Sequence, residues 1–221
     1  MKNIVITSHN SWAIFNFRRN LITSLIDSGY KVYAIADDAK YSKDLKLLGC
    51  EYINISLKPR GKNPIYDFWT LVTLIFTYRK IRPDVVCNFS PKMNIYSAIA
   101  ASVFCIPFIT NINGLGVVFN KNNWLSFLVK QMYKVSQIKA HKVFFQNGED
   151  MDLFINENLI SIDRAEKIPG SGVDLQTFKV VHANNDQVTR FLFLGRLLLE
   201  KGIVDYIEAA RKIINPVKEV T

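Results

Sequence analysis

Two cations, Arg196 and Lys201, stand five residues apart near the end of the 221-residue chain, in the stretch FLFLGRLLLEKG (191–202). Gly195 ends an apolar run typical of a buried strand, and Lys201 falls in the following turn or in the first turn of a helix. Fixed cations beside a helix N-terminus can stabilise a diphosphate leaving group. The spacing therefore indicates a diphosphate-binding pair, with a solvated basic surface as the alternative.

A second group of residues follows other strand-like runs, where side chains would gather at one edge of a sheet. Its members are Ser8, Asn16, Arg18, Lys92, Asn94, Asn113 and Gly114. The helix expected after Ser90 attracts anions at its N-terminus, and Lys92 would add a full positive charge there. Gly114 would let backbone amides approach a ligand oxygen. This edge is a candidate ligand site, with helix caps, tight turns and solvated side chains as the alternatives.

Positive charge is concentrated in parts of the chain, whose formal net charge is +9. Residues 85–148 contain no acidic side chain, and the loop KPRGKNP contributes Lys58, Arg60 and Lys62. A basic surface favours the phosphate groups of nucleic acids, anionic lipids or nucleotides. We expect no nucleic-acid partner, because no recognition-helix or RNA-binding motif accompanies these predicted loops.

The spacing of the remaining reactive residues excludes several kinds of site. The three histidines and three cysteines show no metal-ligand pattern, and no P-loop or Ser-His-Asp arrangement occurs. The stretch NGLG (113–116) is not a dinucleotide fingerprint, because Phe119 occupies the third glycine position. We therefore predict neither a metal nor a cofactor. Cys50, Cys87 and Cys105 lie in apolar contexts and are expected to be buried free thiols.

Membrane insertion and export are not indicated by the sequence. The longest apolar candidate, DFWTLVTLIFTY (67–78), falls well short of the roughly 20 residues of a membrane-spanning helix. The start MKNIVITSHNSW has too short an apolar run for a signal peptide. We expect a cytoplasmic protein, in keeping with cysteines that lack a disulfide pattern.

Apolar runs alternate with helical patterns along most of the chain. The expected strands are 2–7, 31–36, 51–57, 84–89, 107–112, 142–147 and 190–195. This alternation predicts an α/β fold with a Rossmann-like parallel sheet, whose ligands bind outside the carboxyl ends of the strands. We expect a first domain over 1–174, a linker over 175–189 and the start of a second Rossmann-like domain, with its first βα unit, over 190–221.

Several stretches together resemble the retaining GT4 glycosyltransferases, which have the two-domain GT-B fold. The nearest subgroup is similar to bacterial enzymes that extend lipid-linked oligosaccharides. The matching stretches run in the family's order: NFRRNLITSLIDSGYKV, KPRGKNPIYD, RPDVVCNFSPKMNIYSAIAA, IPFITNINGLGVVF, VFFQNGEDMDLF, IPGSGVDLQTF and FLFLGRLLLEKGIVDYIEAARKI. The ordered set is more specific than any single stretch.

The resemblance implies an acceptor site in the first domain and a nucleotide-sugar donor site in the second. Arg196 and Lys201 match the family's donor-diphosphate pair, and Gly172 matches its glycine-rich loop. The second group of residues, from Ser8 to Gly114, would then contact the acceptor. Asn113 stands where many relatives have a histidine, so no catalytic residue is assigned. The family generally needs no metal.

The resemblance also implies that the chain is truncated, because the family's pair of glutamates that holds the donor has no counterpart. We expect a glycosyltransferase that moves a sugar from a nucleotide-sugar donor to a lipid-linked or polysaccharide acceptor in cell-surface glycan assembly. Donor binding and activity would be weak or absent in this chain alone. Its basic loops would hold it against the anionic inner face of the membrane. The alternatives are a non-catalytic acceptor- or membrane-binding remnant, a subunit that needs a separate donor domain, and a nucleotide-sugar epimerase.

Overall fold

The computed structural model describes residues 1–57, 63–115, 119, 123–179 and 189–214. The chain divides into two compact units, residues 1–177 and 178–221, which are described separately. The predicted basic-loop residues Lys58, Arg60 and Lys62 lie outside the described residues, as do positions 180–188 of the predicted linker.

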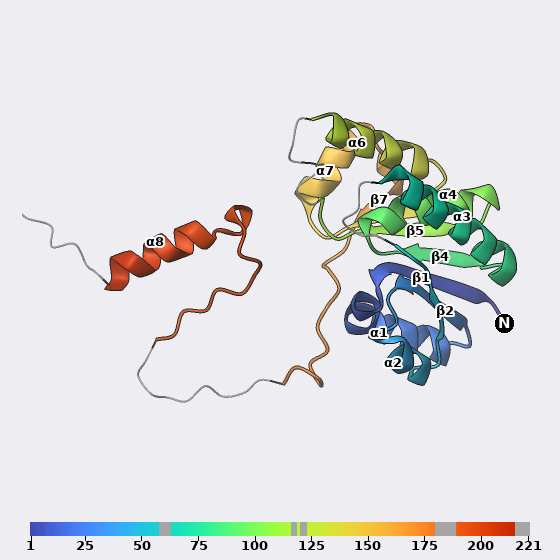
Figure 1. The fold of residues 1–221 in the computed structure, drawn as a ribbon, viewed down its shortest axis with the longest axis horizontal. Helices are drawn as coiled ribbons and strands as arrows, with labels where there is room; N and C mark the ends of the chain where they lie inside the picture. Colours follow the sequence, from blue (N-terminus) through green and yellow to red (C-terminus); the bar gives the residue numbers. More distant parts are fainter. Residues whose placement is uncertain (58–62, 116–118, 120–122, 180–188, 215–221) are drawn as a thin grey trace, which may run out of the picture. The chain divides into compact units, whose positions relative to one another are not determined.

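The first unit is built on a seven-stranded sheet in which every neighbouring pair of strands is parallel (Figure 1). The order across the sheet is β3-β2-β1-β4-β5-β6-β7. The strands are β1 (Asn3–Asn10), β2 (Lys31–Asp37), β3 (Glu51–Asn54), β4 (Val85–Asn88), β5 (Phe108–Ile112), β6 (Lys142–Phe145) and β7 (Ala165–Lys167). The predicted α/β fold with a Rossmann-like parallel sheet is therefore confirmed.

Helices connect the strands, and four of those described have an asparagine in the N-cap position before their first residue. They are α1 (Ser11–Asp27), α2 (Ser42–Leu47), α3 (Pro64–Ile81), α4 (Pro91–Val103), α6 (Trp124–Ser136) and α7 (Gly148–Asn156). The side chains of Asn10, Asn63, Asn123 and Asn147 each accept a hydrogen bond from a first-turn amide. Ser90, which precedes α4, makes no such side-chain hydrogen bond.

Both faces of the sheet are buried, as the continuous apolar runs of the strands require. Along β1, Ile4 and Ile6 pack in one cluster with residues of α1 and α2, and Val5 packs in the other with residues of α3, α4, α6 and α7. Successive side chains of a strand point to opposite faces, so these clusters cover the two sides of the sheet. The strand ends are thereby held in fixed positions.

The second unit contains the expected helix but not the expected strand. A short 3-10 helix, η2 (Leu199–Lys201), precedes α8 (Ile203–Ile214). Residues 190–195 are not a strand, because no other strand of the described chain pairs with them and an isolated strand leaves its backbone groups unpaired. Phe191 and Phe193 contact Tyr206 of α8, whose hydroxyl donates to the Phe191 carbonyl at 2.9 Å.

The cysteines are free thiols, as predicted, but they are not all buried. Cys50 and Cys87 lie in the core, and burial raises the pKa of each thiol to about 12. Cys105 is exposed, which corrects the expectation of burial. It lies just beyond the end of α4 with a positive φ of 54°, in a turn that carries its side chain out of the core.

Candidate functional site

Arg18 lies at the edge of the sheet formed by the carboxyl ends of the strands. Its guanidinium carbon is 4.1 Å from the centroid of the Phe89 ring, and its Nη1 donates to Ser171 Oγ at 3.0 Å. α1 follows β1 directly and Phe89 follows β4, so the adjacency of these two strands brings the two side chains together. Arg18 is only 8% exposed, and burial lowers its pKa to about 10, which leaves it positively charged at neutral pH.

Three further residues connect this pair to the ends of β5, β6 and β7. Gln146 Nε2 donates to Asn113 Oδ1 at 2.9 Å and to Ser171 Oγ at 3.3 Å, and Asn113 Nδ2 donates to the Phe89 carbonyl at 3.3 Å. We call Arg18, Phe89, Asn113, Gln146 and Ser171 the strand-end network. The sequence singled out Arg18 and Asn113, but it did not single out Phe89, Gln146 or Ser171.

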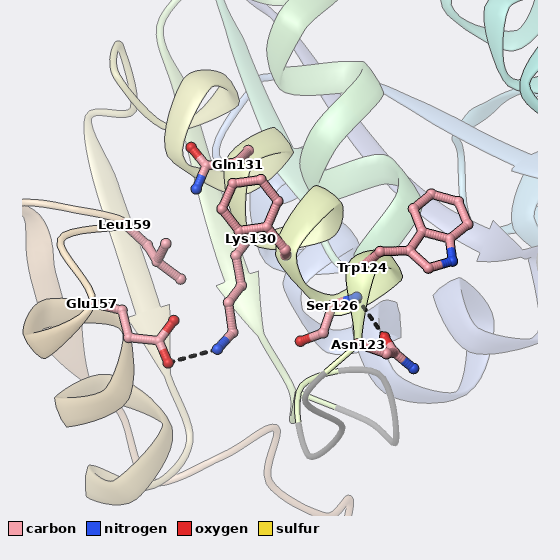
Figure 2. Close-up of a pocket in the computed structure, with 8 residues that line it drawn as sticks. Asn123, Trp124, Ser126, Lys130, Gln131, Glu157 and Leu159 are labelled. Atoms are coloured by element: carbon pink, nitrogen blue, oxygen red, sulfur yellow. Dashed lines mark hydrogen bonds and ion pairs between the residues drawn. The ribbon is translucent and has the colours of Figure 1, made fainter.

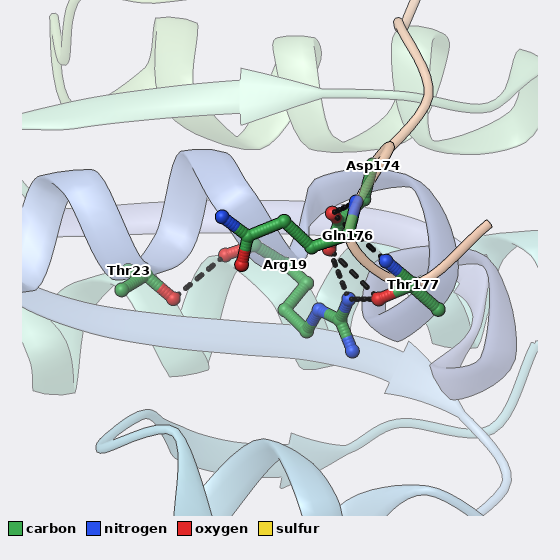
Figure 3. A network of polar contacts seen from close by, with 5 residues as sticks. All are labelled: Arg19, Thr23, Asp174, Gln176 and Thr177. Carbon is green, nitrogen blue, oxygen red and sulfur yellow. Dashed lines mark hydrogen bonds and ion pairs between the residues drawn. The ribbon is translucent and has the colours of Figure 1, made fainter. Parts of the chain in front are cut away.

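Arg19 makes a second connection between α1 and the segment after β7 (Figure 3). Its Nη2 donates to Asp174 Oδ2 at 2.6 Å and to Thr177 Oγ1 at 2.8 Å. Hydrogen bonds from Thr177 and from the amides of Gln176 and Thr177, together with Arg19, lower the pKa of Asp174 to about 2. Arg19 is therefore paired with an acid, and among the described residues Arg18 has no acidic partner.

Lys92 and Asn94, on the first turn of α4, are engaged within the first unit. Lys92 Nζ pairs with Asp67 Oδ1 at 2.5 Å, and the Tyr96 hydroxyl donates to the other oxygen of Asp67 at 2.9 Å. Asn94 is buried, and its Nδ2 donates to the Asn111 carbonyl at 3.1 Å. The charge of Lys92 is thus balanced, and Asn94 fastens α4 to β5.

The remaining predicted residues of the first unit lie around the network without joining its hydrogen bonds. Ser8 is buried in β1, and Asn16 is exposed on α1, where it donates to the Trp12 carbonyl at 2.9 Å. Gly114 and Gly172 have φ angles of 130° and 72°, which favour glycine, and open space lies where each would carry a Cβ. The structure therefore brings Arg18 and Asn113 together and leaves Ser8 and Asn16 outside the network.

Arg196 and Lys201 belong to the second unit, where both side chains are exposed. The Leu198 amide donates to the Arg196 carbonyl at 2.8 Å, and the Lys201 amide donates to the Leu198 carbonyl at 3.0 Å. These backbone turns place Arg196 three residues before η2 and Lys201 at the end of η2. Gly172, the third predicted donor residue, belongs to the first unit.

A surface cavity of about 550 Å³ lies beside α6 and shares no residue with the strand-end network (Figure 2). Its lining residues are Asn123, Trp124, Ser126, Phe127, Lys130, Gln131, Glu157 and Leu159. Lys130 Nζ and Glu157 Oε1 form an ion pair of 2.6 Å across it. None of the residues predicted from the sequence lines this cavity.

The described residues contain neither a cluster of metal-ligating side chains nor a helix that could span a membrane. No group of three or more His, Cys, Asp or Glu side chains in the described ranges could hold a metal ion. No helix in the part of the chain that the structure describes is long and apolar enough to cross a membrane. The predicted absence of a metal and a cofactor stays a prediction.

The fold and the sequence together define the class of protein. Residues 5–147, more than half of the chain, match the family model described as "Glycosyl transferase 4-like". The chain therefore belongs to the glycosyl transferase 4-like family, and the resemblance drawn from its ordered motifs is confirmed.

Two curated relatives are bacterial glycosyltransferases. The chain is 24% identical over 224 residues to the N,N'-diacetylbacillosaminyl-diphospho-undecaprenol alpha-1,3-N-acetylgalactosaminyltransferase of Campylobacter jejuni, covering 92% of this chain and 58% of that protein. It is 27% identical over 171 residues to the UDP-Gal:alpha-D-GlcNAc-diphosphoundecaprenol alpha-1,3-galactosyltransferase of Escherichia coli, covering 71% of this chain and 43% of that protein. The chain thus spans about half the length of these relatives.

The fold is also similar to that of solved glycosyltransferases. The crystal structure of a glycosyltransferase from Rickettsia africae superposes with a TM-score of 0.56 at 16% identity, covering 99% of this chain and 51% of that one. At this identity the likeness concerns the fold alone.

Proposed function

We propose that the protein acts in cell-surface glycan assembly, moving a sugar from a nucleotide-sugar donor to a lipid-linked or polysaccharide acceptor. The strand-end network carries the proposal, because it gathers polar groups where open parallel sheets bind their ligands. Arg18 would contact the acceptor from α1, and Asn113 and Gln146 would contact it from the ends of β5 and β6. The names of both curated relatives describe transfer to sugars linked to undecaprenol through a diphosphate.

Donor recognition is assigned to Arg196, Lys201 and Gly172, whose predicted partner is the diphosphate of the nucleotide sugar. The sugar nucleotide is then a substrate, and the reaction uses no metal or other cofactor. We expect weak donor binding and little or no transfer by these 221 residues alone, because the glutamate pair that the family resemblance associates with donor binding has no match in the sequence.

The proposed site of action is the inner face of the membrane, with the protein bound there from the cytoplasm. α3 supports this placement, since Ile65, Phe68, Trp69 and Phe76 are each 60–65% exposed and recur on one face of the helix. Arg79 and Lys80 occupy the last turn of the same helix. Exposed aromatic side chains beside cations fit the interface of an anionic lipid layer.

Binding and transfer are measured separately to test the proposal. The chain is mixed in detergent with undecaprenyl-diphosphate-linked sugars, and acceptor binding is followed by fluorescence, while transfer from radiolabelled UDP-galactose or UDP-N-acetylgalactosamine is followed by thin-layer chromatography. We expect saturable acceptor binding and little transfer. Failure to bind any lipid-linked sugar would refute acceptor recognition, and rapid transfer would refute the assignment of weak donor binding.

A pair of glutamine variants locates the acceptor. Gln146→Ala removes a member of the strand-end network, and Gln131→Ala removes a residue that lines the cavity beside α6. We expect Gln146→Ala to weaken acceptor binding by about tenfold, the effect of one to two lost hydrogen bonds, and Gln131→Ala to leave it unchanged. The reverse pattern would place the acceptor in the cavity instead.

A further inference from the structure

Arg18 is a buried cation whose charge no acidic residue in the described part of the chain balances. Its Nη1 donates to the neutral hydroxyl of Ser171, and its guanidinium lies over the Phe89 ring. A guanidinium has five N–H donors, so this single hydrogen bond leaves most of its capacity unused. Taking an unpaired charge out of water costs free energy that an anionic ligand would recover.

The start of α4, which follows Phe89 in the chain, supplies a second anion-attracting group. Ser90 follows Phe89 directly, caps the 13-residue helix α4 and is 4% exposed, yet its Oγ has no hydrogen-bond partner among the described residues. The first residue of α4, Pro91, has no N–H to donate, but the dipole of the helix favours negative charge at this end. No acidic residue occupies the first turn of α4.

A purely structural role for Arg18 would explain its contact with Ser171 but not its buried, unpaired charge. A link to Ser171 needs only a neutral donor, such as a glutamine, and would not require a buried charge. The adjacent Arg19 shows the structural solution in the same helix, because its charge is paired with Asp174. Arg18 has the same side chain without such an acid, which is the property of an anion-binding residue.

We propose that Arg18, Ser90 and the first turn of α4 form a binding site for the diphosphate group of a substrate. The inference rests on the proposed function, because both a lipid-linked sugar and a nucleotide sugar contain that group. Arg18 would contact the phosphoryl oxygens through its free N–H groups, and the hydroxyl of Ser90 would donate to them from the start of α4. The site lies entirely within the first unit.

Calorimetric titration of the 221-residue chain with inorganic pyrophosphate at low ionic strength tests the site. We expect Arg18→Gln to weaken binding by at least about tenfold, because it removes charge-assisted hydrogen bonds. Lys134→Gln, which removes one charge from the exposed last turn of α6, should change affinity less than about twofold and controls for net charge. Equal losses in the two variants, or no binding by the unaltered chain, would overturn the proposal.

Two further variants separate binding from folding. Ser171→Ala removes the partner of Arg18 but keeps the cation, so pyrophosphate affinity should stay within about twofold; a loss as large as that of Arg18→Gln would mean that Arg18 acts only through Ser171. If Arg18→Gln does not fold, Arg18→Lys replaces it. A lysine lacks the planar fork of donors, so affinity should fall at least about threefold, and unchanged affinity would refute the site.

Two soluble probes identify the source of the diphosphate. Farnesyl diphosphate represents the lipid-linked acceptor and UDP represents the donor, and the one whose binding depends on Arg18 is the ligand class of the site. If Arg18 governs pyrophosphate binding while no lipid-linked sugar binds, the proposed function fails and the anion site stands. If lipid-linked sugars bind Arg18→Gln with full affinity and neither probe depends on Arg18, the anion site fails and the proposed function stands.

Discussion

Asn88, the last residue of β4, is held by a buried hydrogen-bond network that positions Phe89 beneath Arg18. Its Oδ1 accepts from Thr7 Oγ1 at 2.8 Å and from Ser97 Oγ at 2.5 Å, and Ser97 in turn hydrogen-bonds to the Tyr78 hydroxyl. We therefore predict that Thr7→Val and Ser97→Ala are strongly non-additive. To keep the Tyr78 hydroxyl from being left unpaired, all variants carry Tyr78→Phe.

The expected magnitudes follow from which donors remain. Either single variant leaves Asn88 Oδ1 with one donor and should cost about 1 kcal/mol, whereas the double variant leaves a buried carbonyl unsatisfied. The double variant should therefore cost about 3–4 kcal/mol, an excess of about 1–2 kcal/mol over the sum of the singles. Each kcal/mol corresponds to a melting-temperature decrease of about 2–4 °C in a chain of this size.

Denaturant unfolding followed by circular dichroism measures these costs, with the exposed Thr73→Val of α3 as the control. Thr73 Oγ1 donates to the Trp69 carbonyl within its own helix, so its loss should cost no more than about 0.5 kcal/mol. Simple additivity of Thr7→Val and Ser97→Ala would show that Asn88 does not depend on its two donors. The network would then not explain the position of Phe89.

Three further predictions concern the surface of the chain. Trp69→Ser on α3 should lower binding to anionic vesicles by about tenfold, as measured by flotation. Unchanged binding would refute the proposal that the exposed face of α3 contacts the membrane. A thiol reagent at pH 8 should modify Cys105 quickly, and it should modify Cys50 and Cys87 only after unfolding, since burial raises their pKa to about 12. The pKa of Asp174 falls from about 3.8 to about 2 on folding, so the contribution of this carboxylate to stability is present above pH 4 and is lost as the pH falls toward 2. The NMR chemical shifts of the Gln176 and Thr177 amides, which donate to Asp174, should report this titration. A titration midpoint near pH 4 would contradict the prediction.

The central strands could be predicted from the sequence, because strands buried on both faces read as continuous apolar runs. β7 could not, since Ala165–Lys167 contains two charged residues and is fixed by backbone pairing with β6. For residues 190–195 the sequence predicts a strand that the structure does not contain. This segment has the composition of a buried strand, but no strand of the described chain lies beside it to pair with. The composition of a segment indicates whether it can be buried as a strand, but a strand forms only where a neighbouring strand is available for hydrogen bonding.

The contacts of the candidate site could be predicted only in part, for a similar reason. The rule that ligands bind at the carboxyl ends of parallel strands directed attention to Arg18 and Asn113. The contact between Arg18 and Ser171 joins residues 153 positions apart, and no local pattern reports such a distance. The sequence predicts an anion-binding role for Lys92 from its charge. Its ion pair with Asp67 of α3 forms only because α3 and α4 pack together, which the sequence does not indicate.

The two adjacent arginines of α1 have different roles because successive residues of a helix point in directions about 100° apart. Arg19 reaches Asp174 and Arg18 reaches Ser171, so α1 holds the segment after β7 at two points. Gly172 lies between these two points with a φ of 72°, a conformation that favours glycine. The glycine that the family resemblance assigns to the donor loop therefore lies in a segment held by α1, the same helix that carries the buried arginine we assign to the diphosphate.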